Sequence, residues 1–265
     1  MKIAVCVKEV PDAAVTKRID PNTKRMDRSG ERNLNPFDQH ALEEAMQIKE
    51  GKRGQAQVDE VIAVTMGPSH ADRALHKAVS LGADRSMHLT DDALSGSDVC
   101  ATGYALAKAL ESESPDLVLL GQQSDDGECY RIGAVVADHL KMPSLTQVIK
   151  IDVEDGKLRC ERQAEYGYDT VSVELPAVIS VGDAINEPRY PSLKAIMGAK
   201  KKPLDTKATG DVGIESAQVG EAGSKTQVLE INPPPQKEAG EIIEDEDTNE
   251  TVEKIVAWLD ERKLI

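Results

Sequence analysis

The sequence predicts an α/β fold, in which a doubly wound, mostly parallel sheet has an antiparallel edge and a C-terminal arm ends in a helix. Short apolar, β-branched runs bounded by turn residues alternate with stretches of helical spacing. Beyond them, a stretch with two-residue alternation surrounds a hairpin signal. Strands alternating with helices are typical of a parallel sheet covered on both faces, and a hairpin adds antiparallel strands beside it.

The parallel part is expected from four apolar runs and the helical stretches that separate or follow them. The runs are "KIAVCVK", "EVIAVTMG", "SMHLT" and "PDLVLLG". The helical stretches are Pro36 to Glu50, Ser69 to Leu81, Ser97 to Glu113 and Arg131 to Leu140. Pro36 suits the first turn of its helix, because the N–H that proline lacks has no partner within that turn.

The region from Val148 to Ile179 is expected to form the antiparallel edge. Apolar and polar residues alternate along "SLTQVIKIDVEDGKLRCERQ", the pattern breaks at "EDGK", and it resumes in "YDTVSVELPAVISVG". "EDGK" is a hairpin turn signal between two such runs. A glycine-rich, polar tract follows from Thr206 to Lys225.

Two parts are expected along the chain: an α/β domain over residues 1–227 and an arm over residues 228–265. The arm starts with a Pro-rich, acidic linker, "INPPPQKEAGEIIEDEDTNE", and ends in a helix from Thr251 to Arg262. That helix carries an apolar stripe made of Val252, Ile255, Val256 and Leu259. The stripe needs a surface to cover, either on its own domain or on another chain.

Composition excludes several classes of function. The net charge of −15 over 265 residues argues against nucleic acid, because phosphate binding depends on Lys and Arg. The four cysteines, Cys6, Cys100, Cys129 and Cys160, form no C-x-x-C pair, so neither a zinc site nor a disulfide framework is indicated. No apolar run is long enough to span a membrane, and no signal peptide is recognisable. We therefore expect a cytoplasmic protein, or a mitochondrial matrix protein in a eukaryote.

The stretch "LLGQQSDDGECYRIGAVVADHL" joins an apolar run to a helix start. In a doubly wound sheet, ligands bind outside the carboxyl ends of the strands, and the N–H groups of a helix start can hold a phosphate without any Lys. Asp125, Asp126 and Glu128 would then point outward or cap the helix. The alternative is that Gly121 and Gly127 only form a tight turn. No G-x-G-x-x-G and no P-loop motif is present.

Other motifs add two candidates. "VTMGPSHADRAL" is a second junction of strand, glycine and helix, and it could lie beside the first. The stretch "EPRYPSLKAIMGAKKKPLD" contains Leu193 beside Arg189 and Tyr190, an arrangement that is either a solvated loop or an anchor for a partner. No catalytic constellation is recognisable in the sequence.

These motifs together resemble the β subunit of electron transfer flavoprotein. The similarity runs from Met1 to about Gly213 and resumes at "PPPQKEAG". Its most specific parts are "AVCVKEVPD", "NPFDQHALEEAMQIKE", "VTMGPSHADRALHKAVSLGADR", "DLVLLGQQSDDGE" and "NEPRYPSLKAIMGAKKK". The resemblance implies a Rossmann-like, adenine-nucleotide-binding fold and a heterodimer with an α subunit.

In such a heterodimer the α subunit holds most of a redox-active FAD, which takes electrons from dehydrogenases and passes them on to an acceptor such as a quinone oxidoreductase. The β subunit holds AMP, or a second FAD in electron-bifurcating members. The residues that the resemblance assigns to this nucleotide are Cys6, Asn35, Pro36, Phe37, Asp38, Met66, Gly121, Gln122, Gln123, Ser124, Asp125, Asp126, Gly127, Glu128, Cys129, Tyr130, Arg131 and Ile132.

The resemblance also assigns partner docking to the stretch around Leu193, with Arg189 and Tyr190. The chain departs from the family at Tyr130 and Arg131, where small or amide side chains are usual, and their bulk favours AMP over FAD. An adenine-nucleotide hydrolase or a stress-type binding protein on the same fold is the alternative from another class.

Overall fold

The computed structural model describes residues 1–154, 156–232, 235, 240, 242 and 247–265. The chain divides into two compact units, Met1–Val228 and Leu229–Ile265. Most of the motif "PPPQKEAG" lies outside the described residues, as does Asp155 of "EDGK". Each unit is therefore described by itself.

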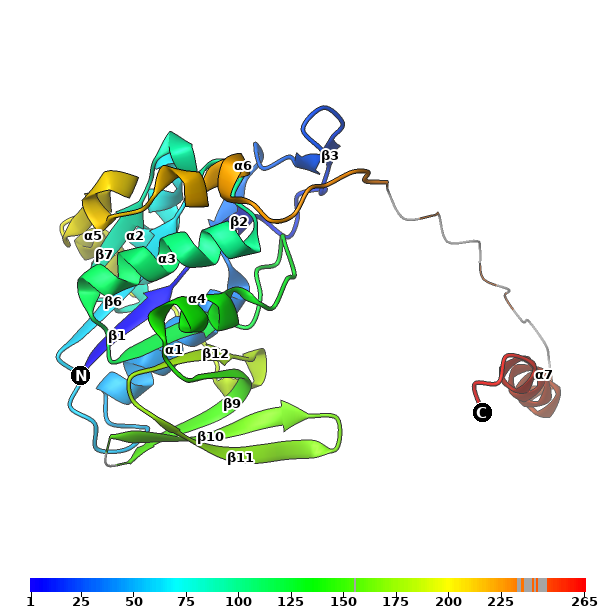
Figure 1. Ribbon diagram of the computed structural model, residues 1–265. Coiled ribbons are helices and arrows are strands. Elements are labelled where there is room, and N and C mark those ends of the chain that lie inside the picture. Colours follow the sequence, from blue (N-terminus) through cyan, green and yellow to red (C-terminus); the bar gives the residue numbers. More distant parts are fainter. Residues whose placement is uncertain (155, 233–234, 236–239, 241, 243–246) are drawn as a thin grey trace. The chain divides into compact units, whose positions relative to one another are not determined.

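The first unit is built on one large sheet (Figure 1). Among the described residues its strand order is β11-β10-β9-β12-β8-β1-β6-β7-β13. In this order, every neighbouring pair from β9 through β12, β8, β1, β6 and β7 to β13 is parallel. In contrast, β10 pairs antiparallel with both β9 and β11. The strands are β1 Lys2–Cys6, β6 Glu60–Met66, β7 Arg85–Leu89, β8 Leu117–Gly121, β9 Ser144–Glu154, β10 Lys157–Ala164, β11 Gly167–Glu174, β12 Ala177–Val181 and β13 Leu204–Lys207. The predicted doubly wound sheet with an antiparallel edge is confirmed. Residues 177–179, which were expected in that edge, instead belong to β12, which pairs parallel with β8 and β9 inside the sheet.

Helices cover both faces of the parallel part. They are α1 Pro36–Lys49, α2 Asp72–Leu81, α3 Val99–Glu113, α4 Ile132–Leu140 and α5 Leu193–Ala199. Figure 1 shows α3 and α4 together on one face. Along β1, Ile3 and Val5 pack into the core under α1 and α2, while Ala4 and Cys6 pack into the core under α3 and α4. Burial on both faces explains why this strand is apolar without alternation.

Several helices start a few residues from the expected positions. The third helix begins at Val99, since the carboxylate of Asp98 accepts a hydrogen bond from the Ala101 N–H. Residues Ser69–Ala71 form a separate 3-10 turn, η1, before α2 begins at Asp72.

The polar tract from Thr206 to Lys225 contains more structure than its composition indicates. Its start belongs to β13, which pairs parallel with β7, and the Asp91 carboxylate accepts hydrogen bonds from the backbone and side chain of Thr209. The short helices η4 Thr209–Val212, η5 Ser216–Gln218 and α6 Gly220–Gly223 follow. A strand at the open edge of a sheet needs no apolar face, which is why "LDTK" carried no strand pattern.

Two small hairpins occupy the stretch between β1 and α1. One pairs β2 Glu9–Pro11 with β5 Arg32–Leu34, and the other pairs β3 Ile19–Asp20 with β4 Arg25–Met26. This stretch brings basic residues to the carboxyl end of β1.

The second unit contains α7, Thr248–Glu261, which begins three residues before the expected Thr251. Its apolar stripe is uncovered: the exposed fractions of Val252, Ile255 and Val256 are 52%, 45% and 47%. None of the helices that the structure describes has the length and apolar character needed to cross a bilayer.

Candidate functional site

The direction in which successive strands are added to the sheet reverses between β1 and β8. From β1 the chain moves through β6 to β7 on one side, and then returns to place β8 and β12 on the other side. In a doubly wound sheet, such a reversal leaves a crevice at the carboxyl ends of the two strands. Cys6 ends β1 opposite Leu120, Gly121 ends β8, and Met66 ends β6 on the other side of β1. The two predicted strand–glycine junctions therefore lie at one edge of the sheet.

Asn35 ties the loop after β8 to the loop after β1. Its side-chain N–H donates to the Gln123 carbonyl at 2.8 Å, and its side-chain oxygen accepts from the Asp125 N–H at 3.1 Å. Its own backbone N–H donates to the Lys8 carbonyl. Asn35 is buried, so these bonds are protected from water. The conformation of the loop thus depends on the start of α1.

Asp38 is buried between β1 and β8. Its carboxylate accepts a hydrogen bond from the Lys8 N–H at 2.8 Å. Burial raises its pKa to about 7, against the hydrogen bonds from Asn35, Lys8 and Gly121 that lower it. Burial, and then the charge of Asp38, raises the pKa of the Cys6 thiol to about 12, so Cys6 is a buried thiol and not a nucleophile.

Gly121 is the point where β8 comes closest to α1. A Cβ on Gly121 would lie 2.6 Å from both Asp38 Oδ1 and the Phe37 carbonyl carbon. Only glycine permits this approach, so Gly121 sets the distance between the loop and the helix start.

Asp126 points inward, which corrects the expectation that the acidic side chains point outward or cap the helix. Lys8 Nζ lies 2.7 Å from Asp126 Oδ1, and Arg28 lies 2.8 Å from Oδ2. Burial raises the pKa of Asp126, but Lys8, Ser124 and Arg28 outweigh burial and hold it below its ordinary value. Lys17 pairs with Asp125 in the same way at the surface.

The cations that pair with Asp125 and Asp126 of this loop therefore come from residues 8–28. Sequence patterns missed them, although Lys8 directly follows the first apolar run.

The rest of the loop leads into α4. The Ser124 carbonyl accepts from the N–H groups of Gly127 and Glu128, which makes a tight turn. Glu128 and Tyr130 have positive φ angles of 44° and 54°, and Arg131 stands at the N-cap of the helix. The remaining predicted residues lie at the start of α1 or in the segment from β8 to α4. Pro36 and Phe37 are in the first turn of α1, and Ile132 begins α4. The Gln122 N–H donates to the Val181 carbonyl, and Cys129 is half-buried.

Two side chains of the loop after β8, Gln123 and Arg131, have polar groups for which the described part of the chain supplies no hydrogen-bond or ion-pair partner. Gln123 Oε1 is buried, and no described residue donates a hydrogen bond to it. Arg131 makes no ion pair within the part of the chain that the structure describes. A buried amide oxygen and a cation at a helix start are suited to an amine or hydroxyl group and a phosphate, respectively.

The predicted docking residues lie apart from this crevice. Tyr190 and Leu193 are 94% and 82% exposed, and Leu193 begins α5. Arg189 instead pairs with Glu43 and Glu50, two residues from the second half of α1 and its C-cap.

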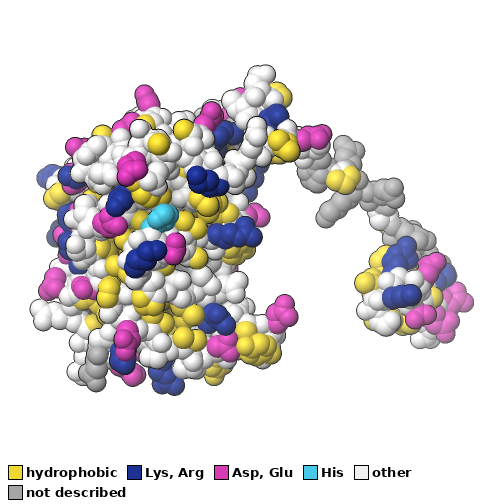
Figure 2. Space-filling view, viewed as in Figure 1, with side chains coloured by type: hydrophobic (Ala, Val, Ile, Leu, Met, Phe, Trp, Pro, Cys, Tyr) yellow, Lys and Arg dark blue, Asp and Glu magenta, His cyan; other side chains and the backbone are white. Residues whose placement is uncertain are grey.

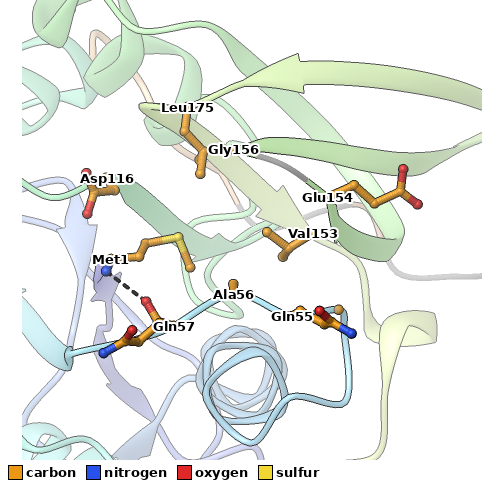
Figure 3. Close-up of a pocket in the computed structure, with 10 residues that line it drawn as sticks. Met1, Gln55, Ala56, Gln57, Asp116, Val153, Glu154, Gly156 and Leu175 are labelled. Atoms are coloured by element: carbon orange, nitrogen blue, oxygen red, sulfur yellow. Dashed lines mark hydrogen bonds between the residues drawn. The ribbon is translucent and has the colours of Figure 1, made fainter.

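A separate cavity of about 940 Å³ opens at the amino ends of β1 and β8 (Figure 3). Its lining includes Met1, Gln55, Gln57, Asp116 and Glu154, and the Met1 amino group donates to the Gln57 carbonyl at 2.8 Å. Ligands of doubly wound sheets bind at the opposite edge, so we do not assign the candidate site here. No group of three or more metal-ligating side chains is found among the described residues.

The fold and the crevice define a doubly wound, Rossmann-like α/β protein with a candidate binding site at its switch point. A family model described as "Electron transfer flavoprotein domain" matches residues 23–211. The chain is 40% identical over 265 residues to the electron transfer flavoprotein subunit beta of Mycobacterium tuberculosis, with 99% of both chains covered. It is 38% identical to the subunit of that name from Thermoanaerobacterium thermosaccharolyticum, over the full length of both chains.

A further relative is the caffeyl-CoA reductase–Etf complex subunit CarD of Acetobacterium woodii, at 39% identity over the full length of both chains. The chain belongs to the electron transfer flavoprotein family, as a β subunit, and its function is electron transfer.

Proposed function

We propose that this chain forms a heterodimer with an electron transfer flavoprotein α subunit and binds AMP at the carboxyl ends of β1 and β8. The α subunit would hold most of a redox-active FAD, which takes electrons from flavin dehydrogenases and passes them to an acceptor such as a quinone oxidoreductase. The nucleotide in this chain has a structural role, and the electron chemistry belongs to the flavin.

The observation that carries the nucleotide site is the loop from Gly121 to Ile132. The side chain of Asn35 holds this loop against the start of α1, and Gly121 permits the close approach. The buried and unpartnered Gln123 Oε1 offers an acceptor for an amine or hydroxyl of adenosine. A preformed loop with one unused buried acceptor is typical of a site built for a small polar ligand.

The charges of the crevice are compatible with a phosphate. Asp126 is neutralised by Lys8 and Arg28, and the raised pKa of Asp38 leaves that carboxyl partly protonated near neutral pH. Arg131 at the start of α4 supplies positive charge beside the backbone N–H groups of the helix start.

The test is to purify the α/β heterodimer, denature it and quantify the released compounds. One AMP and one FAD per heterodimer are expected. A Gly121→Ala variant should lose the AMP while keeping the FAD, because the new Cβ would push the loop away from Phe37 and Asp38. Gly210→Ala is the matched control, since no atom lies within 4 Å of its added Cβ. Equal AMP content in both variants would overturn the site.

The second candidate is a bifurcating subunit with FAD in place of AMP. It is favoured by the 39% identity to a subunit of a reductase–Etf complex. Two FAD and no AMP per heterodimer would establish it. Tyr130, which is 47% exposed in the loop, would then have to leave room for an isoalloxazine ring. Tyr130→Ala is therefore expected to increase FAD uptake if the site binds FAD, and to have no such effect if it binds AMP.

A further inference from the structure

The segment of residues 186–193, which we call the docking segment, is attached to α1 at its first residue. The Asn186 side-chain N–H donates to the His40 carbonyl and to Glu44 Oε2, both at 3.0 Å. The Asn186 carbonyl lies 3.0 Å from His40 Nδ1. The Glu44 side chain is fully buried and also pairs with Arg53, whose Nη2 donates to the same Oε2 at 3.0 Å. Asn186 is therefore fixed to the middle of α1.

Arg189 attaches the segment a second time. Its Nε donates to Glu43 Oε2 at 2.6 Å and its Nη2 to Glu43 Oε1 at 3.1 Å. Its Nη1 and Nη2 donate to the two oxygens of Glu50 at 2.6 and 3.1 Å. The Arg189 backbone N–H also donates to Glu43 at 3.2 Å. Bidentate pairing with each of two carboxylates uses four of the five N–H groups of the guanidinium.

The ion pairs leave Arg189 little capacity to contact another protein. The side chain of Glu43 is only 6% exposed, so this pair lies under the segment and not on its outer side. The hydrogen bonds from Arg189, with a smaller contribution from Lys52, lower the pKa of Glu50 to about 2, so Glu50 stays charged at physiological pH.

Tyr190 and Leu193 follow these two attachments in the chain and face solvent. The exposed fractions are 94% and 82%, and Ser192 caps α5 between them by accepting from the Ala195 N–H. Met197, one turn further along α5, is 76% exposed. The segment thus holds its apolar side chains outward on a backbone that is bonded to a helix of the core.

We infer that Arg189 and Asn186 are positioning residues, which fix the docking segment on α1 so that Tyr190 and Leu193 are presented to a redox partner in one orientation. This inference rests on the proposed function, electron transfer from a dehydrogenase, and it takes Tyr190 and Leu193, to which the resemblance assigned partner docking, as the groups that contact that dehydrogenase. A segment ordered in advance loses less conformational entropy on binding, and this raises affinity without adding any contact to the partner.

The experiment uses the complete α/β heterodimer and a flavin dehydrogenase as electron donor. Arg189→Gln should raise the half-saturating dehydrogenase concentration roughly tenfold, while the limiting rate stays unchanged. Glu43→Gln should do the same, although Glu43 is buried beneath the segment and cannot touch the partner. Arg189→Lys should not restore affinity, because an ammonium cannot pair with two carboxylates in this geometry. Lys49→Gln is the control, since Lys49 pairs with Asp84 and not with the segment.

Two further measurements separate positioning from direct contact. Hydrogen exchange at the Arg189 amide should accelerate in Glu43→Gln even without any dehydrogenase. In a double variant, Leu193→Ala should cost less in the Arg189→Gln background than in the parent, because an unfixed leucine already binds poorly. If Arg189→Gln weakens docking but Glu43→Gln does not, Arg189 contacts the partner and the inference is wrong.

The result for Leu193 alone distinguishes the two proposals. If Leu193→Ala leaves the half-saturating dehydrogenase concentration unchanged, the docking role that the resemblance assigns to Leu193 fails, whereas the AMP site is not affected. If Leu193→Ala raises that concentration and both Arg189→Gln and Glu43→Gln leave it unchanged, only the positioning role fails.

Discussion

Lys8 Nζ lies 2.7 Å from Asp126 Oδ1 and so joins the end of β1 to the loop after β8. Lys8 is 43% exposed, whereas the Asp126 side chain is 1% exposed. The carboxylate is therefore desolvated and depends on Lys8 and Arg28 for its charge, while the cations keep contact with water. Several consequences of this arrangement and of the uncovered surfaces can be measured.

Asp126→Asn is expected to lower the free energy of unfolding by about 1–3 kcal/mol at pH 7, because hydrogen bonds to a buried charged group are lost. Asp125→Asn is the matched control: Asp125 is 32% exposed and pairs with Lys17 at 3.3 Å, so its loss should cost under about 1 kcal/mol. The folded-state pKa of Asp126 lies below 3.8, so its stabilisation is present above that pH and is lost on further acidification. Urea denaturation at two pH values measures both effects, and equal losses in the two variants would contradict the prediction.

Asp38 should titrate near pH 7, far above its ordinary pKa of 3.8. Because the folded state holds this proton more tightly than the unfolded state, the stability contributed by Asp38 falls as the pH rises from 3.8 through 7 and is constant above that. Carbon NMR of the carboxyl group gives the midpoint, and Asp38→Asn identifies the signal. A midpoint near 4 would show that water reaches the carboxylate.

Leu193→Ala is expected to weaken docking of the dehydrogenase roughly tenfold to hundredfold, which corresponds to about 1.5–3 kcal/mol for burying one such side chain in a partner. Stability and nucleotide content should not change, since Leu193 is 82% exposed. Leu204→Ala, at another exposed leucine of the first unit, is the control. A lower melting temperature with unchanged docking would mean that Leu193 is structural.

Deleting residues 232–265 should weaken association with the α subunit far more than it lowers the melting temperature of the first unit. No residue of α7 is buried within its own unit, so its apolar stripe needs a surface outside that unit, and we expect the α subunit to supply it. Ile255→Ser should weaken assembly in the same direction, whereas Glu253→Gln on the same helix should not. Sedimentation of mixed subunits measures the affinity, and an unchanged dissociation constant for the truncated chain would refute this role of the arm.

The sequence was sufficient to predict the fold because burial on two faces demands a local pattern. Apolar strands such as β8 and the helices between them follow from the spacing of residues close in the chain. Local patterns also marked Asn35, Asp38 and Gly121 as a helix start and a strand end. Local patterns did not reveal β13, because a strand at the edge of a sheet does not need an apolar face.

The sequence by itself thus determined most of the segments that become strands and helices, and the edge of the sheet at which we propose that the nucleotide binds. Only the tertiary structure decided that Arg28 reaches Asp126 across 98 positions, and that Arg189 reaches Glu43 across 146. Charged partners so far apart in the chain leave no periodic trace, since either residue alone resembles a solvated side chain. Their pairing arises only when the sheet brings β1 and β8 together and lays the docking segment along α1.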